Sequence, residues 1–325
     1  MRGERLKRME GFKKIRQSIL SSKNIAISGH INPDGDSIGS LLALGLALDS
    51  LGKNVYLLCP GNIPERYRFL PGADCIVSTT NKKIDLAIAL DCSAIELLGK
   101  NISVFKKAKA ILEIDHHEFR RSFGDIRLVD HEAAAVGELV YILLKKLHVA
   151  ITRDIGENLL TSLIVETNLF KLANVRPFTF TACGELLKTG IAFSQLADKV
   201  YGPKTRVEMM LSAICLLRSK FLKKGKIIWS VIRDNDLARV GGKDYDTDMI
   251  ANEMYSMKDV KAAVLFREKN KDTLRVSLRS DGDINIGRVA QEYGGGGHFD
   301  IAGCYIPNNR KSIMQILSSV EALFG

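Results

Sequence analysis

Short, almost continuously apolar segments alternate with helix-like segments in the N-terminal third of this chain. They lie at residues 24–30, 55–60, 75–79, 85–93 and 110–117, and each ends in polar residues, Gly or Pro. Buried parallel strands have this composition, because helices cover both faces of the sheet that they form. We therefore predict an α/β fold whose N-terminal lobe is a parallel sheet flanked by helices.

The charge pattern predicts a boundary in the last third of the chain. Residues 133–217 carry mostly the 3.6-residue apolar periodicity of helices, and the strongly basic segment 218–226 interrupts it. We expect a domain over 1–217 that opens with a basic helix within residues 1–23, then a basic linker. A second domain is expected over 227–325.

The C-terminal domain restarts the strand pattern. Residues 226–233 read as a strand, and residues 262–280 read as a hairpin with its turn at 269–272. Four consecutive glycines, Gly294–Gly297, predict a loop, and a helix is expected from about Lys311. We predict a smaller α/β lobe.

The net charge limits the class of partner. The chain has 325 residues and a formal charge of +10. Residues 1–23 hold eight basic and two acidic side chains, and residues 218–226 hold five basic and no acidic ones. Neither lobe is basic, so we expect a short, phosphate-rich partner and no long duplex DNA.

Apolar content and cysteine usage predict a cytoplasmic protein. No apolar run is long enough to span a membrane, and the N-terminus lacks the apolar core of a secretory signal. The cysteines form no C-x-x-C pair and read as small buried apolar residues in a reducing compartment: Cys59, Cys75, Cys92, Cys183, Cys215 and Cys304.

Acidic and histidine side chains follow three of the predicted strands. The set comprises His30, Asp34 and Asp36, then Asp91, then Asp115, His116 and His117. The carboxyl ends of parallel strands share one edge, where ligands bind. One carboxylate at a strand–helix junction is commonly only a helix cap. Four clustered carboxylates repel one another unless cations intervene, which predicts a site for two divalent ions such as Mn²⁺ with one bridging carboxylate.

Five motifs in order resemble those of the DHH phosphoesterases. GHINPDGDSIGS, ALDCS and EIDHH are similar to the first three motifs of that family, and SLRS with GGGGHFDIAGC is similar to its C-terminal DHH-associated domain. The resemblance implies two lobes with a cleft between them. Within the family, the chain resembles the bacterial and archaeal subgroup that degrades nanoRNA and dephosphorylates 3′-phosphoadenosine 5′-phosphate.

The resemblance also implies roles for individual residues of the N-terminal lobe. The two metal sites would be His30, Asp34 and Asp91 for one Mn²⁺, and Asp36, Asp91 and His116 for the other. His117 would face the scissile phosphate, and Asp115 would orient the histidines.

A phosphate-binding set is implied in the C-terminal lobe. Arg279 and His298, with the backbone N–H groups of Gly295, Gly296 and Gly297, would hold phosphate and ribose. Glycine lets the backbone approach an anion closely, and Arg offers a bidentate fork.

The fourth metal motif departs from the family pattern. Glu166 stands where relatives have an Asp ligand, and Asn168 stands where they have Gly. The extra methylene of Glu166 would displace or weaken the second ion unless the backbone shifts. Arg120, after the third motif, either contacts a substrate phosphate or is a solvated charge.

The expected function is hydrolysis of short oligonucleotides, linear dinucleotides or 3′-phosphoadenosine 5′-phosphate. One alternative is a nucleotide-binding sensor or weakened paralogue, which the changes at Glu166 and Asn168 favour. Another is a RecJ-like single-strand exonuclease, which the chain length disfavours because no domain remains to guide a long strand. The apolar helices of the first lobe predict either a homodimer interface or simply the core of that lobe.

Overall fold

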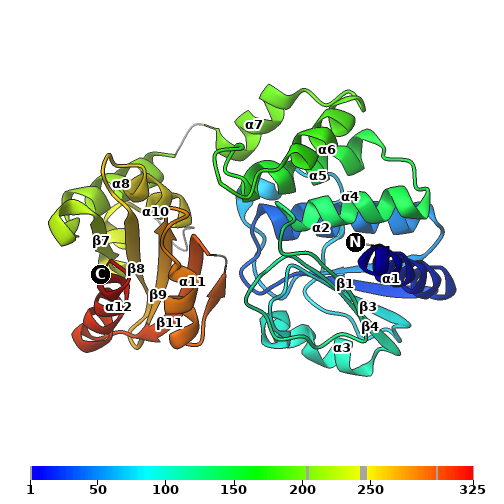
Figure 1. Ribbon diagram of the computed structural model, residues 1–325, viewed down its shortest axis with the longest axis horizontal. Coiled ribbons are helices and arrows are strands. Elements are labelled where there is room, and N and C mark those ends of the chain that lie inside the picture. Colours follow the sequence, from blue (N-terminus) through cyan, green and yellow to red (C-terminus); the bar gives the residue numbers. More distant parts are fainter. Residues whose placement is uncertain (1, 203–204, 242–246, 298, 325) are drawn as a thin grey trace. The chain divides into compact units, whose positions relative to one another are not determined.

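The computed structural model describes residues 2–202, 205–241, 247–297 and 299–324. The chain divides into two compact units, Met1–Gly202 and Pro203–Gly325, and Figure 1 labels the helices and strands of each.

The first unit contains a five-stranded sheet in the order β2-β1-β3-β4-β5. All four strand pairings are parallel, which confirms the predicted architecture. The strands are β1 (Asn24–Ser28), β2 (Asn54–Leu58), β3 (Leu86–Leu90), β4 (Ala110–Asp115) and β5 (Ile126–Val129).

Two details of the strand prediction differ from the structure. Residues 75–79 form no strand: a short 3₁₀ helix occupies Ala73–Cys75, and a single bridge joins Val77 to Leu58. The edge strand β5 was not predicted, because its inner residues Ile126 and Leu128 alternate with polar ones instead of forming a continuous apolar run.

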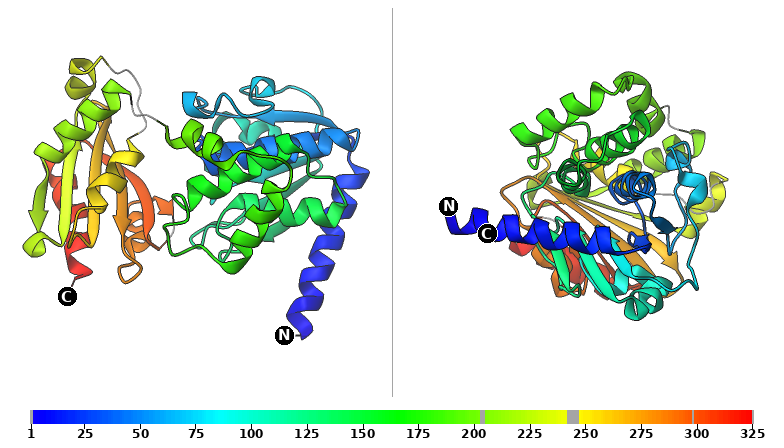
Figure 2. Two further views of the ribbon diagram at one scale, coloured as in Figure 1. Left: turned by 90° about the horizontal axis from the view of Figure 1, so that it is seen from above. Right: turned by 90° about the vertical axis from the view of Figure 1, so that its right-hand side faces the viewer.

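Helices cover both faces of this sheet, as Figures 1 and 2 show. Ile25 and Ile27 of β1 face one helical layer, whereas Ala26 belongs to the core on the opposite face. The first layer contains α1 (Arg2–Ser21), α2 (Gly35–Ser50), α4 (Val136–Leu147), α5 (Arg153–Glu166), α6 (Pro177–Leu187) and α7 (Phe193–Tyr201). The opposite face is covered by α3 (Ile102–Lys107) and the 3₁₀ helix Ile95–Asn101.

Helices α2 and α5 approach each other closely near the start of α2. A Cβ atom at Gly39 would lie 2.4 Å from the carbonyl oxygen of Asn158, so only glycine allows this distance. The contact places Asp36, in the first turn of α2, beside α5.

The second unit contains a six-stranded sheet in the order β10-β11-β9-β8-β7-β6. Only β7 and β8 pair in parallel, and the hairpin over 262–280 is confirmed. The strands are β6 (Lys220–Leu222), β7 (Ile227–Ile232), β8 (Ala262–Asn270), β9 (Thr273–Ser280), β10 (Gly296–Gly297) and β11 (Ile301–Pro307). The helices are α8 (Arg206–Leu217), α9 (Asp234–Arg239), α10 (Asp248–Tyr255), α11 (Ile286–Glu292) and α12 (Arg310–Ala322).

The boundary between the two units lies before α8, at Gly202 and Pro203, and not at the basic segment where we expected it. Leu211 and Cys215 of α8 are buried with Ile228 and Ile232 of β7, so the helix packs in the core of the second unit. The basic segment 218–226 is not an extended linker, because it contains the edge strand β6 and a 3₁₀ turn.

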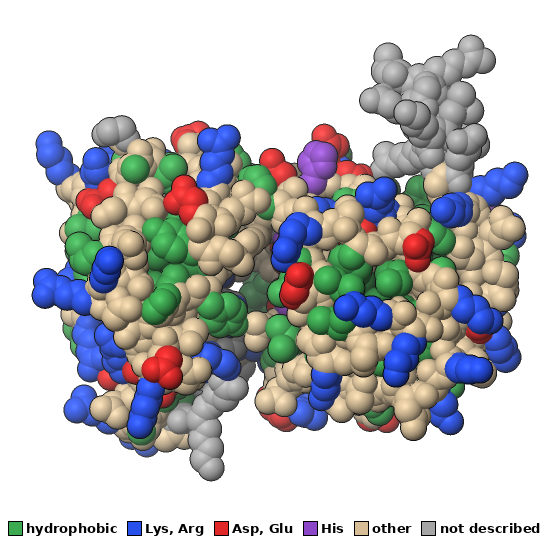
Figure 3. Space-filling view, turned by 90° about the horizontal axis from the view of Figure 1, so that it is seen from below, with side chains coloured by type: hydrophobic (Ala, Val, Ile, Leu, Met, Phe, Trp, Pro, Cys, Tyr) green, Lys and Arg blue, Asp and Glu red, His purple; other side chains and the backbone are tan. Residues whose placement is uncertain are grey.

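Charged side chains, cysteines and helix hydropathy describe the surface and the interior of the two units. Lys and Arg side chains are scattered over that face in Figure 3 and do not join into one continuous stripe. All six cysteines are free, and five are buried, whereas Cys75 is exposed. No helix in the described part of the chain is long and apolar enough to cross a membrane.

Candidate metal centre

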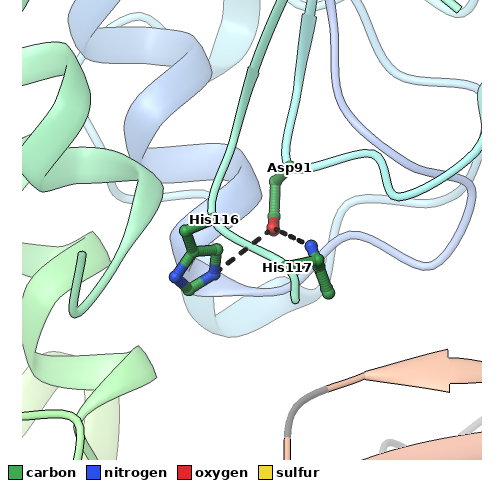
Figure 4. A group of neighbouring side chains, drawn as sticks. All are labelled: Asp91, His116 and His117. Carbon is green, nitrogen blue, oxygen red and sulfur yellow. Dashed lines mark ion pairs between the residues drawn. The ribbon is translucent and has the colours of Figure 1, made fainter. Parts of the chain in front are cut away.

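Asp91 occupies the middle of the predicted site. It follows β3 directly, has a left-handed φ of 58°, and donates its backbone N–H to the Ile114 carbonyl at 3.0 Å. Its side chain points between His116 and His117, which leave the neighbouring strand β4 (Figure 4). This strained turn therefore aims a buried carboxylate across the carboxyl edge of the sheet.

The two oxygens of Asp91 face different histidines. Oδ2 lies 3.4 Å from Nε2 of His30, whereas Oδ1 lies 3.7 Å from Nε2 of His116 and 3.5 Å from Nδ1 of His117. Two three-residue groups whose donor atoms lie within 4.8 Å of one another share this carboxylate: His30, Asp34 and Asp91, and Asp91, His116 and His117. The geometry is that of a carboxylate between two cation positions.

The His30 group is partly open to solvent. Side-chain exposure is 17% for His30 and 45% for Asp34, whose Oδ1 lies 4.0 Å from the His30 Nε2. Asp34 also caps α2, because the same oxygen accepts the backbone N–H of Ser37 at 3.0 Å. The cap and the proposed metal ligand are thus one side chain.

Asp36 anchors a second, fully buried group. Its Oδ1 accepts hydrogen bonds from the hydroxyls of Ser162 (2.6 Å) and Ser40 (3.0 Å). Its Oδ2 accepts the backbone N–H of Val136 at 2.8 Å, and Oδ1 accepts that of Gly137 at 3.2 Å. These donors fix the carboxylate in place before any ligand arrives.

His116 directs a lone pair into this buried group. Its Nδ1 donates to the Ala133 carbonyl at 3.0 Å, so that in the neutral form of the ring Nε2 carries the lone pair. Nε2 lies 3.6 Å from Asp36 Oδ2 and 3.9 Å from Glu166 Oε1. These separations are too long for hydrogen bonds. Ligands of one divalent ion bound at about 2.1 Å lie roughly 3–4 Å apart, so each of these two distances from His116 Nε2 is that of a ligand pair on one cation.

Glu166 reaches the cluster from the last residue of α5. The chain then turns sharply, with φ of 45° at Asn168, 57° at Leu169 and 63° at Phe170. Asn174 supports the turn by donating its side-chain N–H to the Glu166 carbonyl at 3.2 Å. The carboxylate of Glu166 therefore lies beside His116, and Asn168 has a positive φ, which Asn tolerates better than most non-glycine residues.

A chain of polar contacts leads outward from His117. Its Nδ1 lies 2.7 Å from Asp115 Oδ1, and Arg120 donates to the other Asp115 oxygen at 2.9 Å. Arg120 also pairs with the buried Glu113 at 2.8 Å. Arg120 is therefore not a solvated charge, because its guanidinium is held by two carboxylates and its side chain is only 11% exposed. Its contact with a substrate phosphate stays a prediction.

Burial and the charges of neighbouring groups shift the pKa values of the acidic residues in the cluster when no metal is bound. Burial, with the nearby charges of Glu166 and Asp34, raises the pKa of Asp36 to about 7. Burial and the charge of Asp36 raise the pKa of Asp91 well above its ordinary value. Burial opposes ionisation of Asp115 as well, but His117 and Arg120 hold its pKa below the usual range. A nearby cation would lower both pKa values and favour the ionised carboxylates, which is consistent with a cation site here.

Several supporting residues were not predicted from the sequence. Ser162 lies one helical turn before Glu166, so its spacing on α5 could have placed both on one face. Glu138, fully buried, accepts hydrogen bonds from the Ala134 backbone and from the side chains of Arg176 and Thr179. No local pattern marks this network, since its members come from distant elements.

The predicted phosphate-binding residues lie in the second unit. Arg279 is buried and donates to the side chain of Asn252 at 2.6 Å. Gly296 and Gly297 form the edge strand β10 and not a loop, and Gly295 donates its N–H to the Ala290 carbonyl at 2.8 Å. A Cβ at Gly295 would lie 2.1 Å from the Gly303 carbonyl oxygen, so packing against β11 also requires glycine. His298 lies outside the described residues.

Comparisons with known proteins agree with the motif reading. The chain is 29% identical over 283 residues to the bifunctional oligoribonuclease and PAP phosphatase NrnA of Thermus thermophilus, covering 86% of this chain and 83% of that protein. It is 24% identical over 277 residues to the protein of the same name from Bacillus subtilis, covering 84% and 86%.

Solved structures show the same fold. The crystal structure of an exopolyphosphatase-related protein from Bacteroides fragilis matches with a TM-score of 0.86 at 23% identity, covering 96% of this chain and 95% of that one. RecJ of Thermus thermophilus in complex with Mn²⁺ matches with a TM-score of 0.54 at 14% identity, covering 96% and 54%.

Two family models match in the order that the motifs predict. The DHH family N-terminal domain covers residues 24–165, and the DHHA1 domain covers residues 224–325. The chain therefore belongs to the DHH family of phosphoesterases, with a DHH N-terminal domain followed by a DHHA1 domain.

Proposed function

We propose that this protein hydrolyses phosphoester bonds of short oligonucleotides, linear dinucleotides or 3′-phosphoadenosine 5′-phosphate with two Mn²⁺ ions. The position of Asp91 carries the proposal, because its two oxygens face separate histidine groups at 3.4–3.7 Å. His30 and Asp34 would hold one ion with Asp91. Asp36, His116 and Glu166 would hold the other with Asp91.

The bound ions would supply positive charge, and Asp115 and His117 would handle a proton. Ions at these positions would activate a water molecule for attack on phosphorus and neutralise charge on the phosphate oxygens. Asp115, ionised and held by Arg120, accepts a hydrogen bond from Nδ1–H of His117 and would stabilise the imidazolium form of that ring. Nε2 of His117 can then donate a proton to the leaving oxygen.

The substrate class rests on the relatives. Two relatives that match more than four-fifths of this chain are named for oligoribonuclease and PAP phosphatase activity. The charge distribution points the same way, because the excess of basic side chains falls in residues 1–23 and 218–226 and neither lobe is basic. Short substrates with several phosphates fit a site that depends on metal charge.

The test is turnover by the purified full chain with Mn²⁺. Substrates are 5′-labelled pApA, 3′-phosphoadenosine 5′-phosphate and a long single-stranded oligonucleotide. We expect turnover of one or both small substrates, abolished by EDTA and restored by Mn²⁺. Binding without turnover of any substrate would support the sensor alternative. Processive degradation of the long strand in preference to pApA would support the exonuclease alternative.

A further inference from the structure

The two faces of the second unit's sheet are covered differently at the β6–β7 margin, because α8 packs on β7 only from the face opposite Trp229. Helix α12 packs over β8 and β11, and the β6–β7 margin extends beyond it. A groove of about 580 Å³ lies between this margin and the start of α12, lined by Lys220, Trp229, Arg233, Asn308, Arg310 and Met314 among others. We call it the Trp229 groove.

The Trp229 groove is positively charged. Lys220, Arg233 and Arg310 line it, and none of its lining residues is acidic. Within the described residues, neither Lys220 nor Arg310 forms an ion pair, and Arg233 donates to the Asn308 side chain at 2.8 Å. Cations without carboxylate partners in a concave site favour an anionic ligand.

The groove also contains an aromatic platform. The Trp229 ring packs edge-on against Phe266, with centroids 6.2 Å apart and an interplanar angle of 88°. The ammonium of Lys220 lies over the ring, 5.4 Å from its centroid. The buried indole N–H has no acceptor among the described residues. A rigid aromatic ring beside mobile cations is the arrangement on which bases of single-stranded nucleic acids stack.

The groove is separate from the phosphate-binding residues predicted from the family motifs. Trp229 and Leu278 pack in one core of the second unit, whereas Arg279 points to the other face of the sheet and donates to Asn252 of α10. The glycine strand β10 forms the opposite edge of the sheet from β6. The groove therefore does not belong to that set.

We propose that the Trp229 groove binds one nucleotide unit of a single-stranded oligonucleotide. The base stacks on Trp229 after the flexible Lys220 side chain moves aside, and Lys220 and Arg310 hold the phosphate. A volume of about 580 Å³ is in the range of small-ligand sites, which matches a nucleotide. An acidic peptide would use the cations but leave the ring unused. The choice of an oligonucleotide rests on the proposed function.

The experiment uses the intrinsic fluorescence of Trp229, which is the single tryptophan of the chain. The full chain is titrated with a short oligoadenylate in EDTA, so that no metal-dependent turnover contributes. We expect saturable quenching that weakens with added salt, since phosphate contacts release counterions. Free N-acetyltryptophanamide controls for absorption by the oligonucleotide.

Charge reversal at the groove provides the discriminating variant. The double variant Lys220→Glu/Arg310→Glu should bind oligoadenylate about tenfold more weakly or worse, because it loses both phosphate contacts. The matched control is Lys224→Glu/Lys311→Glu, which makes the same charge change at exposed residues that do not line the groove. The control should quench like the unaltered chain.

Three outcomes would overturn the proposal. They are an absence of saturable quenching, equal loss in the control variant, or competition by polyglutamate of equal charge at equal affinity. A separate assay of pApA hydrolysis with Mn²⁺ scores the proposed function. Hydrolysis without quenching would therefore reject the groove alone, and quenching without hydrolysis would reject the proposed function alone.

Discussion

The two halves of the metal centre differ in how firmly the protein holds them. Asp36 is fully buried and accepts four hydrogen bonds, and His116 is fixed by the Ala133 carbonyl. In contrast, the side chain of Asp34 is 45% exposed and accepts one backbone hydrogen bond, and the side chain of His30 is 17% exposed. For the proposed function, the difference predicts one preorganised ion position and one exchangeable position, joined by Asp91.

Removing the shared carboxylate should have the largest effect. We expect Asp91→Asn to lower kcat/KM for pApA on the order of 10³-fold or more, because both ion positions lose a ligand. The measurement is steady-state hydrolysis in Mn²⁺, with Asp49→Asn, an exposed residue of α2, as the control. Near-normal activity of Asp91→Asn would refute the bridging role.

Substitutions on either side of Asp91 should separate the two positions. Asp36→Asn is expected to weaken the tighter Mn²⁺ step by at least about 10²-fold, since loss of an outer partner alone costs 10–100-fold. Asp34→Asn should weaken mainly the looser step. Isothermal titration of each variant with Mn²⁺ measures both. Equal effects on both steps in both variants would show that the halves do not differ.

Shortening Glu166 tests the departure in the fourth motif. The Glu166 oxygen lies 3.9 Å from His116 Nε2, and Glu166→Asp would withdraw the carboxylate by one C–C bond. We expect an activity loss of about 10-fold to 10²-fold, as for misplacement of a reacting group by about 1 Å. An unchanged or higher rate would mean that Glu166 is a strained substitute for Asp.

A hydroxyl deletion tests the preorganisation directly. Ser162→Ala removes the 2.6 Å hydrogen bond to Asp36 without removing a proposed ligand. We expect about tenfold weaker binding of the tighter Mn²⁺ and little change at the looser position. Thr161→Ser, on the same helix, is the control. Loss confined to the looser position would contradict the assignment.

The smallest predicted effect concerns pH. The pKa of Asp36 in the folded, metal-free chain is about 7, above its ordinary value of 3.8. The folded state thus binds a proton more tightly than the unfolded state, and stability falls as pH rises from about 4 to 7. The metal-free Tm should drop by a few degrees between pH 5 and pH 8. Mn²⁺ should raise Tm more at pH 8, and an equal rise at both values would contradict this linkage.

The sequence predicted the sheet and the site because both depend on local patterns. Continuous apolar runs marked β1, β3 and β4, and the acids and histidines at their ends lie where parallel strands must converge. Ser162 shares a face of α5 with Glu166, but its hydrogen bond to Asp36 depends on the packing of α5 against α2, which the sequence does not mark. Arg176 was missed because its partner Glu138 lies far from it in the chain. The glycine run was misread as a loop, since only its pairing with β11 shows the edge strand.

The central claim is that Asp91 joins two divalent ions in one site. Electron paramagnetic resonance of the chain loaded with two equivalents of Mn²⁺ tests this claim most directly. We predict the spectrum of an exchange-coupled Mn²⁺ pair, which Asp91→Asn should convert to that of isolated ions. Isolated Mn²⁺ signals from the unaltered, fully loaded and active chain would contradict the account.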